Sequence, residues 1–143
     1  MKVKIINKSK HEMPEYKTKG ASGIDIRANL ESDIVLKPLE RILVPTGLFL
    51  EMEEGYEAQV RARSGLAIKK GISLVNGIGT IDSDYRGEVK VIIINLSNEE
   101  VTIKDGERIA QIVFMKIEVP QIIETQNISE TERGDGGFGH TGL

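Results

Sequence analysis

The feature of this sequence that most limits its fold is a series of short runs rich in β-branched residues, separated by turn residues. Runs of this kind predict strands, and their close spacing leaves little room for helices between them. We expect strands at residues 3–7, 23–28, 41–44, 48–51, 57–63, 72–75, 88–96, 101–103 and 109–115. Because proline cannot donate a hydrogen bond to a sheet, we also expect each proline, Pro45 included, at the edge of a run.

Only residues 65–70 (GLAIKK) have the composition of a helix, and they make a short one. Strands at this spacing, without helices between them, predict an all-β sandwich or barrel with antiparallel pairing. Turn residues at 54–55, 97–98 and 105–106 lie at boundaries between the predicted strands. The length of 143 residues is that of one domain with its own core.

Composition excludes several classes of function. The chain has no cysteine, which excludes disulfides and thiolate metal sites, and its net charge of −3 argues against a nucleic-acid surface. The longest aliphatic run, residues 91–94, is too short to span a bilayer, and the first ten residues carry lysines where a signal peptide needs an apolar run. We therefore expect a cytoplasmic protein with neither nucleic acid nor membrane as a partner.

Residues 129–143 differ from the rest of the chain. They are polar and rich in glycine, with Phe138 as their one aromatic side chain. Such a segment buries too little apolar surface to order itself. It is either a disordered terminus or a flap that orders on a ligand, and composition does not choose between these. We divide the chain into a folded domain, 1–128, and a flexible C-terminal arm, 129–143.

The sequence Arg63-Ser64-Gly65 ends a predicted strand and opens the helix. Amide groups at a helix start favour anions, and glycine lets a ligand approach the backbone closely. With a guanidinium and a hydroxyl beside them, these residues are a candidate phosphate site. The alternative is that Ser64 caps the helix and Arg63 forms a surface ion pair.

Residues 76–88 (NGIGTIDSDYRGE) combine turn chemistry with Asn76, Asp82 and Tyr85. A hairpin here would expose backbone donors and acceptors at its edge, which can match the O4, N3–H and O2 groups of uracil. A buried Asp82 beside that edge could take a proton from water. The alternative is a hairpin with solvated acids and with Tyr85 in the core.

Two further polar residues interrupt apolar strands. Gln111 lies in the run 106–114, and its amide needs partners, either backbone groups or a ligand phosphate. Asp25 lies between Ile24 and Ile26 and faces away from them, as a solvated strand residue does. The sequence has no histidine or cysteine cluster, no calcium loop, and no serine-hydrolase, P-loop or dinucleotide-binding motif.

Five segments together resemble the trimeric dUTPase family. They follow one another in the order typical of that family and span nearly the whole chain. The segments are 21–28 (ASGIDIRA), 63–67 (RSGLA), 79–88 (GTIDSDYRGE), 106–114 (GERIAQIVF) and 133–142 (RGDGGFGHTG).

The resemblance implies a β-jelly roll that assembles as a homotrimer with three active sites between subunits. It implies hydrolysis of dUTP to dUMP and pyrophosphate with Mg²⁺, which keeps uracil out of DNA and supplies dUMP for thymidylate synthesis. Asp82 matches the residue that activates the attacking water, and Tyr85 matches the tyrosine that packs under the deoxyribose and excludes a 2′-hydroxyl.

The resemblance assigns the remaining site residues by segment. The uracil would be bound by Asn76, by the backbone of Gly79, Thr80 and Ile81, and near the backbone of Lys90. The phosphates would be bound by Arg63, Ser64, Gly65 and Gln111. The closing arm would contribute Arg133, Phe138 and Gly139, with Phe138 over the uracil and Arg133 at the γ-phosphate. Asp25 would touch the water shell of the Mg²⁺ ion.

The chain departs from the family pattern at two positions. Ala62 replaces a proline before the Arg-Ser-Gly sequence, and His140 replaces a serine in the last segment. His140 would either donate to a phosphate or be solvated. Two other functions are weighed: a dCTP deaminase of the same fold, and a catalytically silent trimer that binds a nucleotide or a protein partner.

Overall fold

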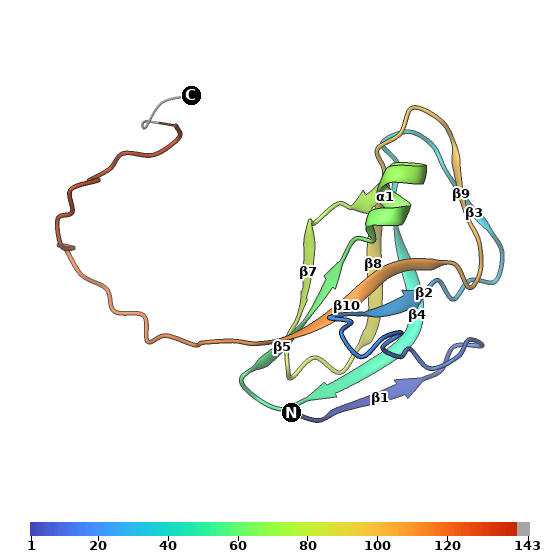
Figure 1. Cartoon of the computed structure of the whole chain (residues 1–143), viewed down its shortest axis with the longest axis horizontal. Helices are drawn as coiled ribbons and strands as arrows, with labels where there is room; N and C mark the ends of the chain where they lie inside the picture. The colour runs from blue at the N-terminus through green and yellow to red at the C-terminus, as the bar shows by residue number, and fades with distance from the viewer. Residues whose placement is uncertain (140–143) are drawn as a thin grey trace.

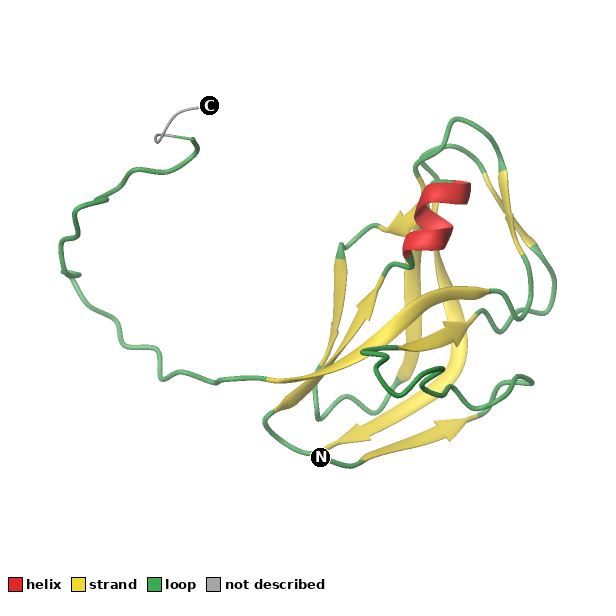
Figure 2. Ribbon diagram, viewed as in Figure 1, coloured by secondary structure: helices red, strands yellow, loops and turns green. Residues whose placement is uncertain are grey.

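The computed structural model describes residues 1–139, which form strands, one short helix and a long C-terminal segment (Figures 1 and 2). The elements are β1 (Val3–Asn7), β2 (Ile24–Arg27), β3 (Ile34–Leu36), β4 (Arg41–Met52), β5 (Tyr56–Arg61), α1 (Ser64–Lys70), β6 (Ile72–Leu74), β7 (Ile78–Ile81), β8 (Glu88–Asn95), β9 (Val101–Ile103) and β10 (Arg108–Lys116). The prediction of an all-β fold with one short helix is confirmed.

The strands form three antiparallel sheets. One has the order β1-β4-β8-β6, the second has the order β2-β10-β5-β7, and β3 pairs with β9. Non-consecutive strands are neighbours in both larger sheets, so the chain crosses between them repeatedly. Helix α1 follows β5 of one sheet and packs beside β6 of the other (Figure 2).

The core is aliphatic and follows from the alternation of side chains along the strands. On β8, Val89, Val91 and Ile93 are almost fully buried, while the residues between them are more exposed. On β2, Ile24 and Ile26 are buried in the same core. Burying one such side chain stabilises the fold by about 1.5–3 kcal/mol.

Strand β4 corrects the prediction of two separate runs. It is continuous from residue 41 to 52, and its pairing with β8 shifts register between Pro45 and Leu48. The expectation that Pro45 lies at the edge of a run is therefore wrong. A bulge accepts proline because the ladder is already interrupted there, and Gly47 has the left-handed φ of 70° within it.

The hairpin expected within residues 76–88 is wrong, because β7 pairs with β5, and β8 pairs with β4 and β6. Two strands, β3 and β7, were not among the predicted runs. Each is only three or four residues long and each pairs with a single strand within residues 1–139, β3 with β9 and β7 with β5. Strands β6 and β9 are equally short and were predicted, so length alone does not explain the omission. Pairing with β9 and β5 defines β3 and β7 as strands.

The long loop after β1 is fastened to the β9–β10 turn through Asp105. Its carboxylate accepts a hydrogen bond from the Leu30 amide at 2.8 Å and contacts His11 Nε2 at 3.0 Å and Lys10 Nζ at 3.2 Å. These contacts lower the pKa of the Asp105 carboxyl to about 2. The hydrogen bond from the Leu30 amide is the largest cause. The contacts with His11 and Lys10 also lower the pKa, while desolvation raises it.

After β10 the chain leaves the sheets. Residues 117–139 contain no helix or strand, and they extend away from the rest of the molecule (Figure 1). Apolar side chains on this segment are exposed, namely Val119, Ile122, Ile123 and Ile128. The division at residue 128 stays a prediction, but the last strand ends earlier, at Lys116. In the part of the chain described, no helix is long and apolar enough to cross a membrane.

The lowered pKa of Asp105 predicts an acid-dependent contribution to stability. A carboxyl whose pKa is lowered by folding stabilises the fold above its ordinary pKa, and this stability is lost as the pH falls through the folded value. We expect Asp105→Asn to unfold more readily than the wild type at neutral pH, and the difference to disappear as the pH falls from 3.8 to about 2. Urea unfolding followed by circular dichroism across this range measures it. A difference that does not change with pH would contradict the assignment.

Candidate active site

A pocket lies between the edge strand β7, the turn that follows it and the outer face of β8. We call it the edge pocket, and it contains many of the residues predicted to bind a base and sugar. Its lining includes the predicted site residues Asn76, Gly79, Thr80, Ile81, Asp82, Tyr85 and Lys90. The apolar part of its lining includes Leu43, Val60, Leu74 and Ile92. Residues that are apart in the sequence thus meet in one cavity.

The backbone of β7 forms one wall of the edge pocket. Thr80 pairs with Gln59 of β5 and Gly79 with Val60, so one side of the strand is bonded within the sheet. The opposite side has no strand partner within residues 1–139. An edge strand in this position presents a row of amides and carbonyls that a planar ligand can bind.

Asp82 directly follows β7, because the strand ends at Ile81 and turn residues begin there. Its carbonyl accepts a hydrogen bond from the Tyr85 amide at 3.2 Å, which closes the turn. The side chain is exposed, so the prediction of a buried Asp82 is wrong for the single chain. The carboxylate lines the edge pocket and is accessible to a water molecule there.

Tyr85 also lines the edge pocket and is 47% exposed, which rules out a place in the core. Its hydroxyl donates to the Glu88 carbonyl at 3.1 Å. The hydrogen bond of its hydroxyl thus holds the partly exposed ring at the pocket wall. An aromatic ring in such a position packs well against an apolar or sugar surface.

A second group of predicted residues lies across strands β2, β10 and β5 of the same sheet. Gln111 of β10 is paired in register with Asp25 on one side and with Arg61 on the other. We call Asp25, Arg63, Arg108 and Gln111 the arginine cluster. Strand β5 joins the two groups, because it pairs with β10 along one edge and with β7 along the other.

Ion pairs hold the arginine cluster together. Arg63 Nε donates to Asp25 Oδ1 at 2.8 Å, and Arg108 Nη1 donates to Asp25 Oδ2 at 3.0 Å. Arg63 also donates to the Arg108 carbonyl at 3.0 Å. Interpreting Asp25 as a solvated strand residue is therefore wrong, and Arg63 does form the ion pair that was considered as the alternative to a phosphate site. The pair also fixes the Arg63 side chain in place.

The start of α1 differs from the capping alternative. The cap residue is Arg63, with extended backbone angles and no side-chain cap hydrogen bond, and Ser64 is the first helical residue. Interpreting Ser64 as the N-cap is therefore wrong. Ser64 and Gly65 are both exposed, and nothing lies within 4 Å of where a Gly65 side chain would begin. These groups remain accessible to a ligand.

Gln111 is half-buried, and its side-chain Nε2 donates to the Ala62 carbonyl at 3.1 Å. Of the two expected kinds of partner for this amide, a backbone group or a ligand phosphate, the backbone group is present. The Ala62 carbonyl lies directly before Arg63, so this hydrogen bond also supports the backbone at the start of the candidate phosphate site.

The residues described do not provide a protein cage for a metal ion. Among residues 1–139 there is no group of three histidine, cysteine, aspartate or glutamate side chains placed to hold one. Asp25 was the expected contact for a Mg²⁺ water shell, and both of its oxygens are engaged by arginines.

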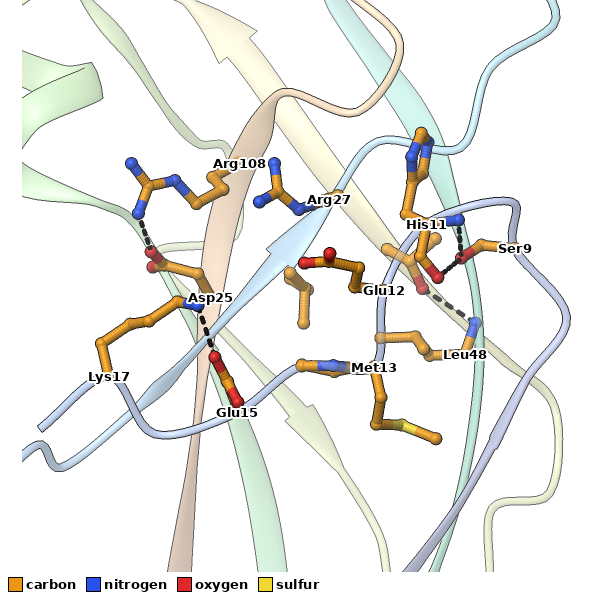
Figure 3. Close-up of a pocket in the computed structure, with 13 residues that line it drawn as sticks. Ser9, His11, Glu12, Met13, Glu15, Lys17, Asp25, Arg27, Leu48 and Arg108 are labelled. Atoms are coloured by element: carbon orange, nitrogen blue, oxygen red, sulfur yellow. Dashed lines mark hydrogen bonds and ion pairs between the residues drawn. The ribbon is translucent and has the colours of Figure 1, made fainter. Parts of the chain in front are cut away.

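Another pocket opens next to the arginine cluster, between the loop after β1 and strands β2, β4 and β10. Figure 3 shows Arg108 reaching Asp25 at its edge and Lys17 paired with Glu15 across its mouth. The pocket mixes both signs of charge, with Arg27 and Glu12 also in its lining. None of the residues predicted to bind uracil or sugar lies in it.

The predicted arm residues lie apart from both groups. Arg133 donates to the carbonyl of Gly136 at 2.8 Å, while Phe138 and Gly139 are exposed on the extended C-terminal segment (Figure 1). His140 lies outside the described residues. Within one chain the edge pocket and the arginine cluster lie on opposite sides of β5, and the arm extends away from both.

Sequence reasoning missed two residues of these groups, Arg108 and Glu88. Arg108 completes the pairing of Asp25, and Glu88 lines the edge pocket and accepts the Tyr85 hydroxyl on its backbone carbonyl. Both lie within segments that the sequence singled out, 106–114 and 79–88. Their roles depend on pairing across strands or on a turn, which residue identity alone does not reveal.

Comparison with known proteins identifies the family. The sequence pattern of the dUTPase family matches residues 9–142. Deoxyuridine 5′-triphosphate nucleotidohydrolases of Finegoldia magna and Fusobacterium nucleatum are 59% and 57% identical to this chain over 142 residues, covering 99% of this chain and 99% and 97% of theirs. The chain belongs to the dUTPase family.

Solved dUTPase structures agree with the fold. A mutant of the Staphylococcus bacteriophage 80alpha dUTPase, solved with dUpNHpp, matches with a TM-score of 0.87 and 27% identity over 99% of both chains. Another 80alpha dUTPase structure with dUpNHpp has a TM-score of 0.85 at the same identity and coverage. The jelly-roll fold expected from the family resemblance is confirmed.

Proposed function

We propose that this chain hydrolyses dUTP, supplied as its Mg²⁺ complex, to dUMP and pyrophosphate, in a homotrimer whose active sites form between subunits. The observation that carries the proposal is the edge pocket, where Asn76, Asp82 and Tyr85 line one cavity beside the free backbone edge of β7. This pocket unites groups suited to a base, a sugar and an attacking water.

The base would bind along β7. Uracil offers an acceptor at O4, a donor at N3 and an acceptor at O2, and the backbone of Gly79, Thr80 and Ile81 supplies amides and carbonyls at a pocket wall. Asn76 adds a side-chain amide and Lys90 a further stretch of backbone. A site that fits uracil closely rejects the methyl group of thymine by its size and cytosine by its reversed donor pattern.

Asp82 would act as the general base. It lines the edge pocket next to Tyr85, where its carboxylate can accept a proton from a water that attacks the α-phosphorus of a bound dUTP. A placed carboxylate of this kind is typically worth about 10²–10⁴ in rate. Its exposure in the single chain fits a site that is closed by other subunits and by the arm, because closure excludes bulk water.

The phosphates would bind at the arginine cluster. Arg63 offers a guanidinium already oriented by Asp25, and the exposed Ser64 and Gly65 offer a hydroxyl and backbone amides beside it. Gln111 would complete this set. Mg²⁺ prefers phosphate oxygens and water over protein cages, which fits a metal carried by the triphosphate. Asp25 then serves the phosphates mainly through the arginines.

Assembly would complete the site. The edge pocket does not include any member of the arginine cluster, and the arm extends away from both. A site that needs base, phosphate and arm residues together therefore draws them from different copies of the chain. The segment that leads into the arm has exposed apolar side chains, such as Ile122 and Ile123, which support docking of this segment on another copy, with Arg133, Phe138 and Gly139 at the closing end.

No observation favours the deaminase or the catalytically silent trimer over this proposal. A cysteine-free chain is suited to a reducing compartment, and we place the activity in the cytoplasm.

A substrate panel tests the activity. We expect pyrophosphate release with Mg²⁺ from dUTP, and little from dTTP, dCTP or UTP, because the site distinguishes each by the 5-methyl group, the base edge or the 2′-hydroxyl. The measurement is a coupled pyrophosphate assay. Equal turnover of UTP or dTTP would contradict the proposed base and sugar recognition, and ammonia release from dCTP would favour the deaminase.

Replacing Asp82 tests the general base. Asp82→Asn should bind dUTP within a few-fold of the wild type while its kcat falls by about 10²–10⁴. Calorimetric binding and steady-state kinetics separate the two effects. Asp84→Asn is the matched control, because Asp84 is exposed in the same turn but does not line the edge pocket. Near-normal turnover of Asp82→Asn would remove Asp82 from the mechanism.

Truncation tests the arm. Deleting the residues after Glu132 should lower turnover of dUTP by about 10²-fold through loss of closure and positioning, with the thermal unfolding midpoint unchanged. Kinetics and differential scanning calorimetry measure both quantities. A lowered midpoint together with unchanged turnover would mean that the arm is structural instead.

A further inference from the structure

Gly87 lies directly against the ring of Tyr85. A Cβ atom at Gly87 would come within 2.2 Å of the Tyr85 hydroxyl oxygen, 2.4 Å of Cζ and 2.8 Å of Cε2. Such distances are far below van der Waals contact, so the observed ring position requires a residue without a side chain. Gly87 is not among the residues with positive φ, so the close approach of the Tyr85 ring, and not a left-handed backbone, favours glycine here.

The ring is also anchored to the framework of the fold. The Tyr85 hydroxyl donates to the Glu88 carbonyl at 3.1 Å, and Glu88 is the first residue of β8. The Glu88 carboxylate accepts a hydrogen bond from the Gly47 amide at 2.8 Å, within the bulge of β4. The far end of the ring is therefore held by a residue that both central strands fix in place.

The backbone of Tyr85 is fixed separately. Its amide donates to the Asp82 carbonyl at 3.2 Å, and Arg86 Nη1 donates to the carbonyls of Ser83 and Tyr85 at 2.7 and 3.2 Å. With the turn closed in this way, the remaining freedom of Tyr85 is rotation of its side chain. Contact with Gly87 sets the position at which the rotating Tyr85 ring stops.

We propose that Gly87 is a positioning residue for sugar selection: by leaving room for the Tyr85 ring to lie back against the chain, it sets how far the ring reaches into the edge pocket toward the 2′ position of a bound nucleotide. This inference rests on the proposed function of the preceding subsection. A side chain at residue 87 displaces the ring, and the pocket then fits a ribose and a deoxyribose more equally.

The test compares Gly87→Ala with the wild type and with Gly20→Ala. Gly20 is the matched control because nothing lies within 4 Å of its missing side chain and its φ is not positive. We expect the ratio of kcat/KM for dUTP to kcat/KM for UTP to fall by about tenfold or more in Gly87→Ala, the lower range of discrimination by one small group in a pocket. Gly20→Ala should keep the wild-type ratio.

A spectroscopic measurement follows the ring itself, with or without substrate. The chain has three tyrosines, Tyr16, Tyr56 and Tyr85, so ¹³C-labelled tyrosine gives a spectrum simple enough to assign by substitution. The ring resonances of Tyr85 should shift in Gly87→Ala while those of Tyr16 and Tyr56 stay in place. An unshifted Tyr85, or a shifted Tyr85 with an unchanged dUTP-to-UTP ratio, would overturn the role of Gly87.

Two designs keep the inference separable from its premise. If the wild type releases no pyrophosphate from dUTP, the proposed function is overturned. If the wild type is selective for dUTP and Gly87→Ala has the same dUTP-to-UTP ratio, only the role of Gly87 is overturned. If Gly87→Ala does not fold, Tyr85→Phe carries the test, because it keeps the ring but removes its anchor on Glu88. Its dUTP-to-UTP ratio should fall, and a wild-type ratio would count against the inference.

Discussion

The bulge of β4 against β8 is the constraint on which the site of this protein depends. There the chain passes from Pro45, which has no amide to donate, through the buried Thr46 to Gly47. The interrupted ladder is replaced by side-chain bonds, since the Thr46 hydroxyl donates to the Val89 carbonyl and the Gly47 amide donates to the Glu88 carboxylate. These bonds fix the start of β8, from which the Tyr85 turn is held.

The two halves of the candidate site share one sheet only in part, because β8 of the other sheet forms one wall of the edge pocket. Strand β5 separates the edge pocket on β7 from the arginine cluster on β10 and β2. Strand pairing therefore keeps the two groups apart within one chain. The ion pairs of Asp25 fix the side chains of Arg63 and Arg108, in a position where the sequence alone predicts a solvated aspartate.

Much of the fold could be predicted from local pattern. The runs at β1 and β9 were delimited correctly, and β2, β5, β6, β8 and β10 were located to within a few residues, because alternating burial leaves a direct trace in the sequence. Strands β3 and β7 were missed, although the equally short β6 and β9 were predicted, and pairing with β9 and β5 defines them as strands. The break expected at Pro45 was wrong because a bulge, which is a property of two strands, absorbs the proline.

For the site, the sequence by itself determined the residue types and the family. The segments around Asp25, Arg63, Asp82 and Gln111 carry the family resemblance. They do so because the chemistry of a ligand restricts which side chains can bind it or react with it. The tertiary structure alone decided their geometry. It placed Asp82 in an exposed turn, engaged both oxygens of Asp25 with arginines, and set the Tyr85 ring against Gly87. The reason is physical, because ion pairs, ring positions and exposure depend on neighbours that only strand pairing and turn closure bring into contact.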